Sequence, residues 1–149
     1  MNANKPLTLD EFHFLLGQTI MYCQIIEGDI KHIYCAMRRG DIIDNFFLIE
    51  QQKWTLGETL VELQKLDYSD NRPYLSLDDY DYLRKLTRKR NHWCHEAYLN
   101  FVYLGDDFPS SKEYKKECRR LVDDNSTLAD VYRKLEQVRI RAMHDFKRN

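Results

Sequence analysis

The residues best suited to chemistry lie in the stretch LTRKRNHWCHEAYLNF, residues 86–101. A permanent cation, an amide, an imidazole and a phenol occur there as Arg90, Asn91, His95 and Tyr98. Histidine titrates near neutral pH and can act as a general base or acid. Arginine stays charged and can hold two phosphate oxygens by parallel hydrogen bonds, while an amide or a phenol can orient the same oxygens. These residue types suit cleavage of RNA, in which a ribose 2′-hydroxyl attacks the adjacent phosphate and no metal is required.

The spacing of these residues is only partly that of one helix face. Asn91 and His95 are four positions apart, and His95 and Tyr98 are three apart, so a helix places all three on one side. Arg90 lies five positions before His95, which is roughly 140° away around the helix axis. The length of the arginine side chain, a local kink or a second subunit would each bring the two groups together, and these three alternatives remain open.

Three further side chains in the same stretch, Arg88, Lys89 and His92, are predicted to bind RNA. Residues 84–149 carry 16 Lys and Arg against 10 Asp and Glu, a net charge of +6, whereas residues 1–83 carry 7 against 14, a net charge of −7. The basic part is therefore where a polyanion is expected to bind. The alternative is an ordinary solvated helix face, on which charged side chains are common.

The order RNHWCH, with Arg90, Asn91 and then His95, resembles the R-x4–6-H motif of HEPN domains. Arg88 gives a second match to the same motif, so the arginine has two candidates. The resemblance implies a helical bundle that dimerises, with motif residues of both copies lining a cleft at the two-fold axis. It also implies a metal-independent endoribonuclease with no cofactor, of the kind found in toxin–antitoxin, abortive-infection and phage-defence systems. A cognate antitoxin protein would then be a further partner.

The resemblance also implies roles for individual residues. Arg90 would stabilise the phosphate, His95 would be the general base or acid, and Asn91 would be the polar helper. Some toxin members carry a tyrosine two positions after the histidine. This chain has Ala97 at that position, and Tyr98 follows one position later, so Tyr98 is a candidate site residue with a shifted register.

Two other interpretations remain open. The first is the same helical dimer without catalysis, a regulatory or scaffold module whose basic face binds nucleic acid or an acidic partner. The second is a structural zinc site, because His92, Cys94 and His95 are zinc-ligand types and Cys118, His32 or a carboxylate would complete the set. No pair among the four cysteines has the CxxC spacing, and no disulfide framework is indicated.

Composition places the chain among globular proteins. Hydrophobic residues make up 43% and charged residues 32% of its 149 positions, which predicts a single globular domain over residues 1–149. The motif resemblance implies that this domain is HEPN-like. The stretch MNANKPLTLDEF lacks the layout of a signal peptide, and no run of about 18 apolar residues occurs. These features predict a cytoplasmic protein with reduced thiols and no membrane partner.

Helix start and stop signals divide the chain into helical segments. Thr8 with Glu11 forms a capping box, and apolar residues then recur every three or four positions to Met37, just before Gly40. No segment alternates cleanly between apolar and polar residues. The sequence therefore predicts an all-α, up-and-down helical bundle of about five to six helices. The motif resemblance implies that this bundle is HEPN-like. Further helices are expected over DIIDNFFLIEQQK, from Thr55, from Ser76 to about Leu104, over residues 111–122, and from Ser126 or Thr127 to about His144.

Overall fold

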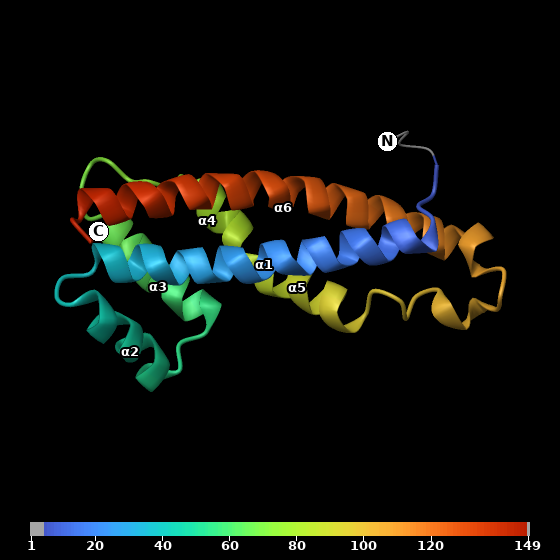
Figure 1. Ribbon diagram of the computed structural model, residues 1–149, viewed down its shortest axis with the longest axis horizontal. Coiled ribbons are helices and arrows are strands. Elements are labelled where there is room, and N and C mark those ends of the chain that lie inside the picture. Colours follow the sequence, from blue (N-terminus) through green and yellow to red (C-terminus); the bar gives the residue numbers. More distant parts are fainter. Residues whose placement is uncertain (1–4, 149) are drawn as a thin grey trace. The chain divides into compact units, whose positions relative to one another are not determined.

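The computed structural model describes residues 5–148, and every regular element in that range is helical (Figure 1). The predicted all-α class is therefore confirmed. None of the helices within this range is both long and apolar enough to cross a membrane. The α-helices are α1 (Leu9–Met37), α2 (Ile42–Gln52), α3 (Leu56–Asp67), α4 (Leu77–Arg84), α5 (Leu86–His95) and α6 (Lys112–Asp145), and two short 3-10 helices are η1 (Val102–Leu104) and η2 (Phe108–Ser110).

The predicted capping box at the start of α1 is confirmed, and the predicted helix starts at Thr55 and Ser76 are capping boxes as well. In each, a hydroxyl accepts a hydrogen bond from a backbone N–H three residues later, and the carboxylate of that later residue accepts one from the backbone of the capping residue. These reciprocal pairs fix the starts of α1, α3 and α4 by local chemistry alone. The pairs are Thr8 with Glu11, Thr55 with Glu58, and Ser76 with Asp79.

The connection between α1 and α2 is also set locally. Gly40 adopts a φ of 98°, in the left-handed region that favours glycine. Asp41 then begins α2 by accepting a hydrogen bond from the Ile43 N–H at 2.8 Å. Buried Asn45 donates through its amide to the carbonyl oxygens of Cys35 and Arg38, at 3.0 and 3.1 Å. The first turn of α2 is thereby bonded to carbonyls at the end of α1.

The predicted single helix from Ser76 to about Leu104 is wrong in two places. The helix is interrupted at Lys85, between α4 and α5, although no glycine or proline marks that position. α5 then ends at His95, and the chain continues in turns, with the Phe101 N–H donating to the Tyr98 carbonyl at 3.2 Å. Phe101 is fully buried after these turns, so packing of its ring accompanies the change from helix to turn.

The two helices predicted after residue 111 are one continuous helix, α6. The segment between the two expected helices holds polar residues of the kind that compete with the backbone for hydrogen bonds. In the fold these side chains have partners elsewhere. Asp124 accepts from the Trp93 indole and the Lys89 ammonium, both at 2.9 Å. Asn125 donates to Gln18 at 3.0 Å, so its amide does not disturb the helix backbone.

The chain packs as two compact units. One contains the described residues up to Cys23 together with Arg88–Asp130. The other contains Gln24–Thr87 together with the described residues from Val131 onward. α1 and α6 each contribute to both units, whereas α2, α3 and α4 lie in the second.

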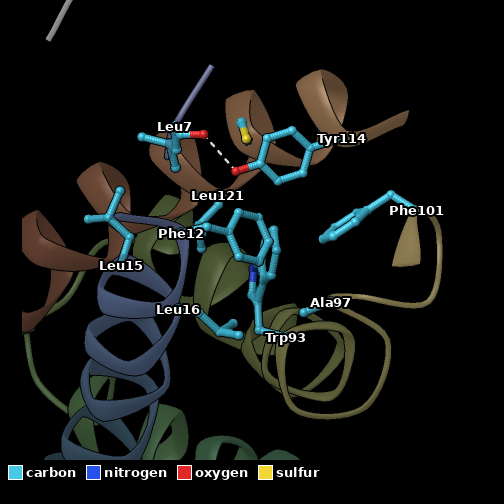
Figure 2. Packing of buried hydrophobic residues seen from close by; sticks show 10 residues of the cluster. Leu7, Phe12, Leu15, Leu16, Trp93, Ala97, Phe101, Tyr114 and Leu121 are labelled. Atoms are coloured by element: carbon cyan, nitrogen blue, oxygen red, sulfur yellow. Dashed lines mark hydrogen bonds between the residues drawn. The ribbon is translucent and has the colours of Figure 1, made fainter. Parts of the chain in front are cut away.

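The first unit has an aromatic core (Figure 2). The ring of Phe12 lies edge-on to Phe101, with 5.5 Å between their centroids, and Phe101 lies edge-on to Tyr114 at 5.0 Å. The Tyr114 hydroxyl donates to the Leu7 carbonyl at 2.6 Å. Trp93 of α5 is buried in the same cluster. α5 is therefore attached to this unit by the side of the helix that bears Trp93.

The second unit contains a buried carboxylate that organises the loop after α3. Asp67 is 2% exposed and accepts three hydrogen bonds. They come from the N–H groups of Tyr74 and Leu75, at 2.7 and 3.1 Å, and from the Tyr80 hydroxyl at 2.8 Å. The end of α3, the loop and α4 are therefore connected through one side chain.

The capping aspartate of α4 gives a prediction about pH. Burial alone would raise the pKa of Asp79, but hydrogen bonds from Lys134 and Ser76 outweigh it and hold that pKa below its ordinary value. A carboxylate whose pKa is lower in the folded than in the unfolded state stabilises the fold at pH values above the unfolded-state pKa. This stabilisation is lost as the pH falls through the folded-state pKa. We expect Asp79→Asn to lower the free energy of unfolding by about 1 kcal/mol at pH 7 and by less near pH 3.

Urea denaturation at the two pH values measures this difference. Asp78→Asn is the matched control, because Asp78 is exposed in the same first turn and has no part in the capping box. A loss for Asp79→Asn that grows on acidification would contradict the prediction.

Candidate functional site

Two of the predicted catalytic residues lie on one exposed side of α5. His95 is the last residue of the helix and Asn91 is one turn earlier, and both are exposed. The predicted sharing of a face by Asn91 and His95 is confirmed, because α5 is helical without interruption over both. No hydrogen-bond or ion-pair partner of the His95 ring is found among residues 5–148. The imidazole is therefore accessible to a ligand.

The two candidate arginines lie differently on α5. Arg90 is half-buried and already interacts with another residue of the chain. α5 is helical without interruption from Arg90 to His95, which favours side-chain reach or a second subunit as the way to bring them together. Arg88 is exposed and lies seven positions before His95, within about 20° of it around the axis and roughly 10 Å along it. Arg88, Asn91 and His95 thus form an exposed stripe, called the α5 stripe below.

The prediction that one helix places Tyr98 on the same side as His95 is wrong, because α5 ends at His95 and Tyr98 lies in the turns beyond it, half-buried. Its hydroxyl is hydrogen-bonded to Nδ1 of His13 at 2.6 Å, and its ring packs 5.5 Å from that of Phe12. Burial raises the pKa of Tyr98, so near neutral pH it is a protonated phenol. His13 is exposed and was not among the predicted site residues. No local signal identifies it, because the bond spans 85 positions of the chain.

Two of the three residues predicted to bind RNA are engaged inside the first unit. The Lys89 ammonium is paired with Asp124 at 2.9 Å. His92 is 7% exposed, with Nε2 at 2.9 Å from Glu117 and Nδ1 at 3.3 Å from Glu96. Both side chains are held by carboxylates of the same chain, which argues against direct RNA contacts.

The chain matches no family model, no curated protein and no solved structure. Its function therefore has to be argued from the chemistry and placement of its own residues.

The groups proposed as zinc ligands are not brought together. Cys94 and His95 are exposed, whereas Cys118 is buried and His92 is held by carboxylates. Among residues 5–148 no group of three or more His, Cys, Asp and Glu is arranged to hold a metal ion. α5 therefore offers a ligand a cation, an amide and an imidazole on one exposed side.

Proposed function

We propose that this chain is a HEPN-type, metal-independent endoribonuclease that acts as a homodimer. The observation that carries the proposal is the α5 stripe, in which exposed Arg88, Asn91 and His95 share one side of a helix. An imidazole with no partner in the described chain is free to exchange protons with a substrate. An exposed guanidinium in line with it can hold a phosphate. A toxin or phage-defence setting in the cytoplasm, with an antitoxin partner, follows from the motif resemblance alone.

The chemistry itself favours two copies of the stripe. In the cleavage step the 2′-oxygen bonds to phosphorus as it loses its proton, and the bond to the 5′-oxygen breaks as that oxygen gains a proton. The products are a 2′,3′-cyclic phosphate and a 5′-hydroxyl. One imidazole cannot accept the first proton and donate the second at the same moment. In a two-fold dimer His95 of each protomer would supply one role, because each copy presents the same surface to the other.

The test is cleavage of total RNA by the purified protein in excess EDTA. We expect fragments that end in a 2′,3′-cyclic phosphate, and a rate at least about 100-fold lower for His95→Ala, because a general acid–base group is removed. His144→Ala is the matched control, since His144 is also an exposed histidine near a helix end. Equal cleavage by wild type and His95→Ala would place the activity elsewhere or in a contaminant.

The same assay assigns the arginine. We expect Arg88→Ala to lower the rate about 100-fold, because one oxyanion-stabilising donor is typically worth that much. A larger loss of rate for Arg90→Ala than for Arg88→Ala, with both proteins folded, would assign phosphate stabilisation to Arg90. Arg90 and His95 would then be brought together by the length of the arginine side chain or by a second subunit.

The second candidate function is a non-catalytic HEPN-like dimer that acts as a regulatory or binding module. The engagement of Lys89 and His92 by carboxylates favours it, since it removes two of the cations expected to contact RNA. A folded wild-type dimer that cleaves none of several RNAs would select this candidate.

A further inference from the structure

A cleft of about 1090 Å³ lies in the second unit, between residues at the ends of α1, α3 and α6. It is larger than a single phosphate needs and falls at the upper end of the range of small-molecule sites. Its most frequent charged group is the guanidinium. The arginines that line it are Arg38, Arg39, Arg72, Arg141 and Arg148.

The carboxylates of the cleft already accept hydrogen bonds from the chain. Asp67 accepts three, as described above. Asp70 accepts from the backbone N–H of Arg72 at 2.8 Å, and Asp145 accepts from the Tyr74 hydroxyl at 2.6 Å. Five guanidinium groups against these three carboxylates leave a net charge of +2 on the lining. The carboxylates do not neutralise the cleft.

Three of the arginines have a structural role. The Arg148 guanidinium donates to carbonyl oxygens that follow α1, including that of Gly40 at 2.7 Å. Arg38 donates to the Tyr34 hydroxyl at 3.0 Å. Arg141 lies over the Tyr74 ring, 5.2 Å from its centroid. These contacts explain why three arginines are found near the C-terminal ends of α1 and α6, where positive charge is also favourable.

Arg39 and Arg72 have no such role. Both are exposed, and the guanidinium of neither has a hydrogen-bond or ion-pair partner within residues 5–148. They come from different segments, one after α1 and the other from the loop after α3, yet line the same cleft. Two free guanidinium groups that converge on one space suit a multiply charged phosphate better than a single carboxylate.

An exposed aromatic ring lines the same cleft. Phe146 lines the cleft and is 41% exposed. An apolar ring next to guanidinium groups offers a nucleobase a surface on which to stack, and such stacking is tolerant of base identity. Phosphate-binding and base-stacking groups together describe a nucleotide.

We propose that this cleft binds a nucleoside triphosphate, with its phosphates on Arg39 and Arg72 and its base against Phe146. A cleft of this volume with two free guanidinium groups and one exposed ring has room and contacts for one nucleotide, whereas an RNA strand requires cations along a groove that follows its backbone. The site is separate from the α5 stripe and does not depend on RNA cleavage. Binding should therefore be unchanged in the His95→Ala protein.

The test is calorimetric titration of the full chain with ATP, GTP, CTP and UTP, with tripolyphosphate and with adenosine. We expect one saturable site with a Kd below about 1 mM for at least one triphosphate, competition by tripolyphosphate, and no measurable binding of adenosine. The Arg39→Ala/Arg72→Ala protein should bind about 100-fold more weakly, because each charge-assisted contact is worth roughly tenfold. Phe146→Ala should weaken nucleotide binding about tenfold and leave tripolyphosphate binding unchanged.

Arg119→Ala is the matched control, because Arg119 is an exposed arginine of α6 in the first unit. It should bind nucleotides as wild type does. The proposal is overturned if no triphosphate or tripolyphosphate binds at about 1 mM, or if the double variant binds as tightly as wild type. It is also overturned if an RNA oligonucleotide binds in an Arg39- and Arg72-dependent way and nucleotides do not compete.

Discussion

Replacing Asp67 with alanine is expected to lower the free energy of unfolding by about 3 kcal/mol. Three buried or half-buried donors converge on this carboxylate, two backbone N–H groups and the Tyr80 hydroxyl. Burial, together with the neighbouring Asp67 carboxylate, raises the pKa of Tyr80, so its hydroxyl keeps its proton and donates. Alanine would leave all three donors without an acceptor in a site that water scarcely reaches.

Urea denaturation followed by circular dichroism measures this loss. Asp70→Ala is the control, because Asp70 is an exposed carboxylate in the loop after α3 with a single hydrogen bond. Adding Tyr80→Phe tests the mechanism, since the two changes share one interaction and their effects should not add. A loss for Asp67→Ala no larger than that for Asp70→Ala would contradict the prediction.

Replacing Trp93 with alanine is expected to lower the free energy of unfolding by about 4 kcal/mol. Trp93 is 1% exposed, packs in the aromatic core of the first unit and donates its indole N–H to Asp124. The change removes a large buried ring and also leaves Asp124 with Lys89 alone. Trp93→Phe keeps most of the packing and removes the donor, so it should lose about 1 to 2 kcal/mol.

The neighbouring exposed Cys94 supplies the control for this site. Cys94→Ala should change the stability by less than about 0.5 kcal/mol, because nothing packs over an exposed side chain. Thermal and urea unfolding should rank the variants alanine, phenylalanine and wild type in order of increasing stability. A phenylalanine variant as unstable as the alanine variant would mean that the hydrogen bond, and not the packing, dominates.

The sequence was sufficient to predict features that depend only on residues close together in the chain. The starts of α1, α3 and α4 rest on a hydroxyl and a carboxylate three residues apart, and Asn91 and His95 share a face because of helix geometry alone. The continuity of α6 could not be predicted, because Asp124 and Asn125 favour a break until their partners on α5 and α1 are known.

The candidate site likewise has features that depend on neighbouring residues and features that depend on residues far away in the sequence. Exposure of His95 near a helix end agrees with its polar surroundings in the sequence. Burial of His92 depends on Glu117, 25 positions away, and the bond from Tyr98 to His13 depends on a residue 85 positions away. Neither distance leaves a periodic signal in a single sequence. Lys89 and His92 were therefore expected to contact RNA, whereas α5 directs both toward carboxylates of the fold.

The hydrogen bonds that join α1 and the residues before it to α6 and the residues after it have a consequence for how the chain folds. In the first unit Tyr114 bonds to Leu7 and Asn125 to Gln18, and each pair is 107 positions apart. In the second unit Arg148 bonds to Ala36 across 112 positions. Contacts so distant in sequence slow folding relative to bundles whose neighbours are consecutive. On the ribosome α1 would wait, with its apolar stripe uncovered, until α6 had been synthesised, which makes the nascent chain a natural client for chaperones.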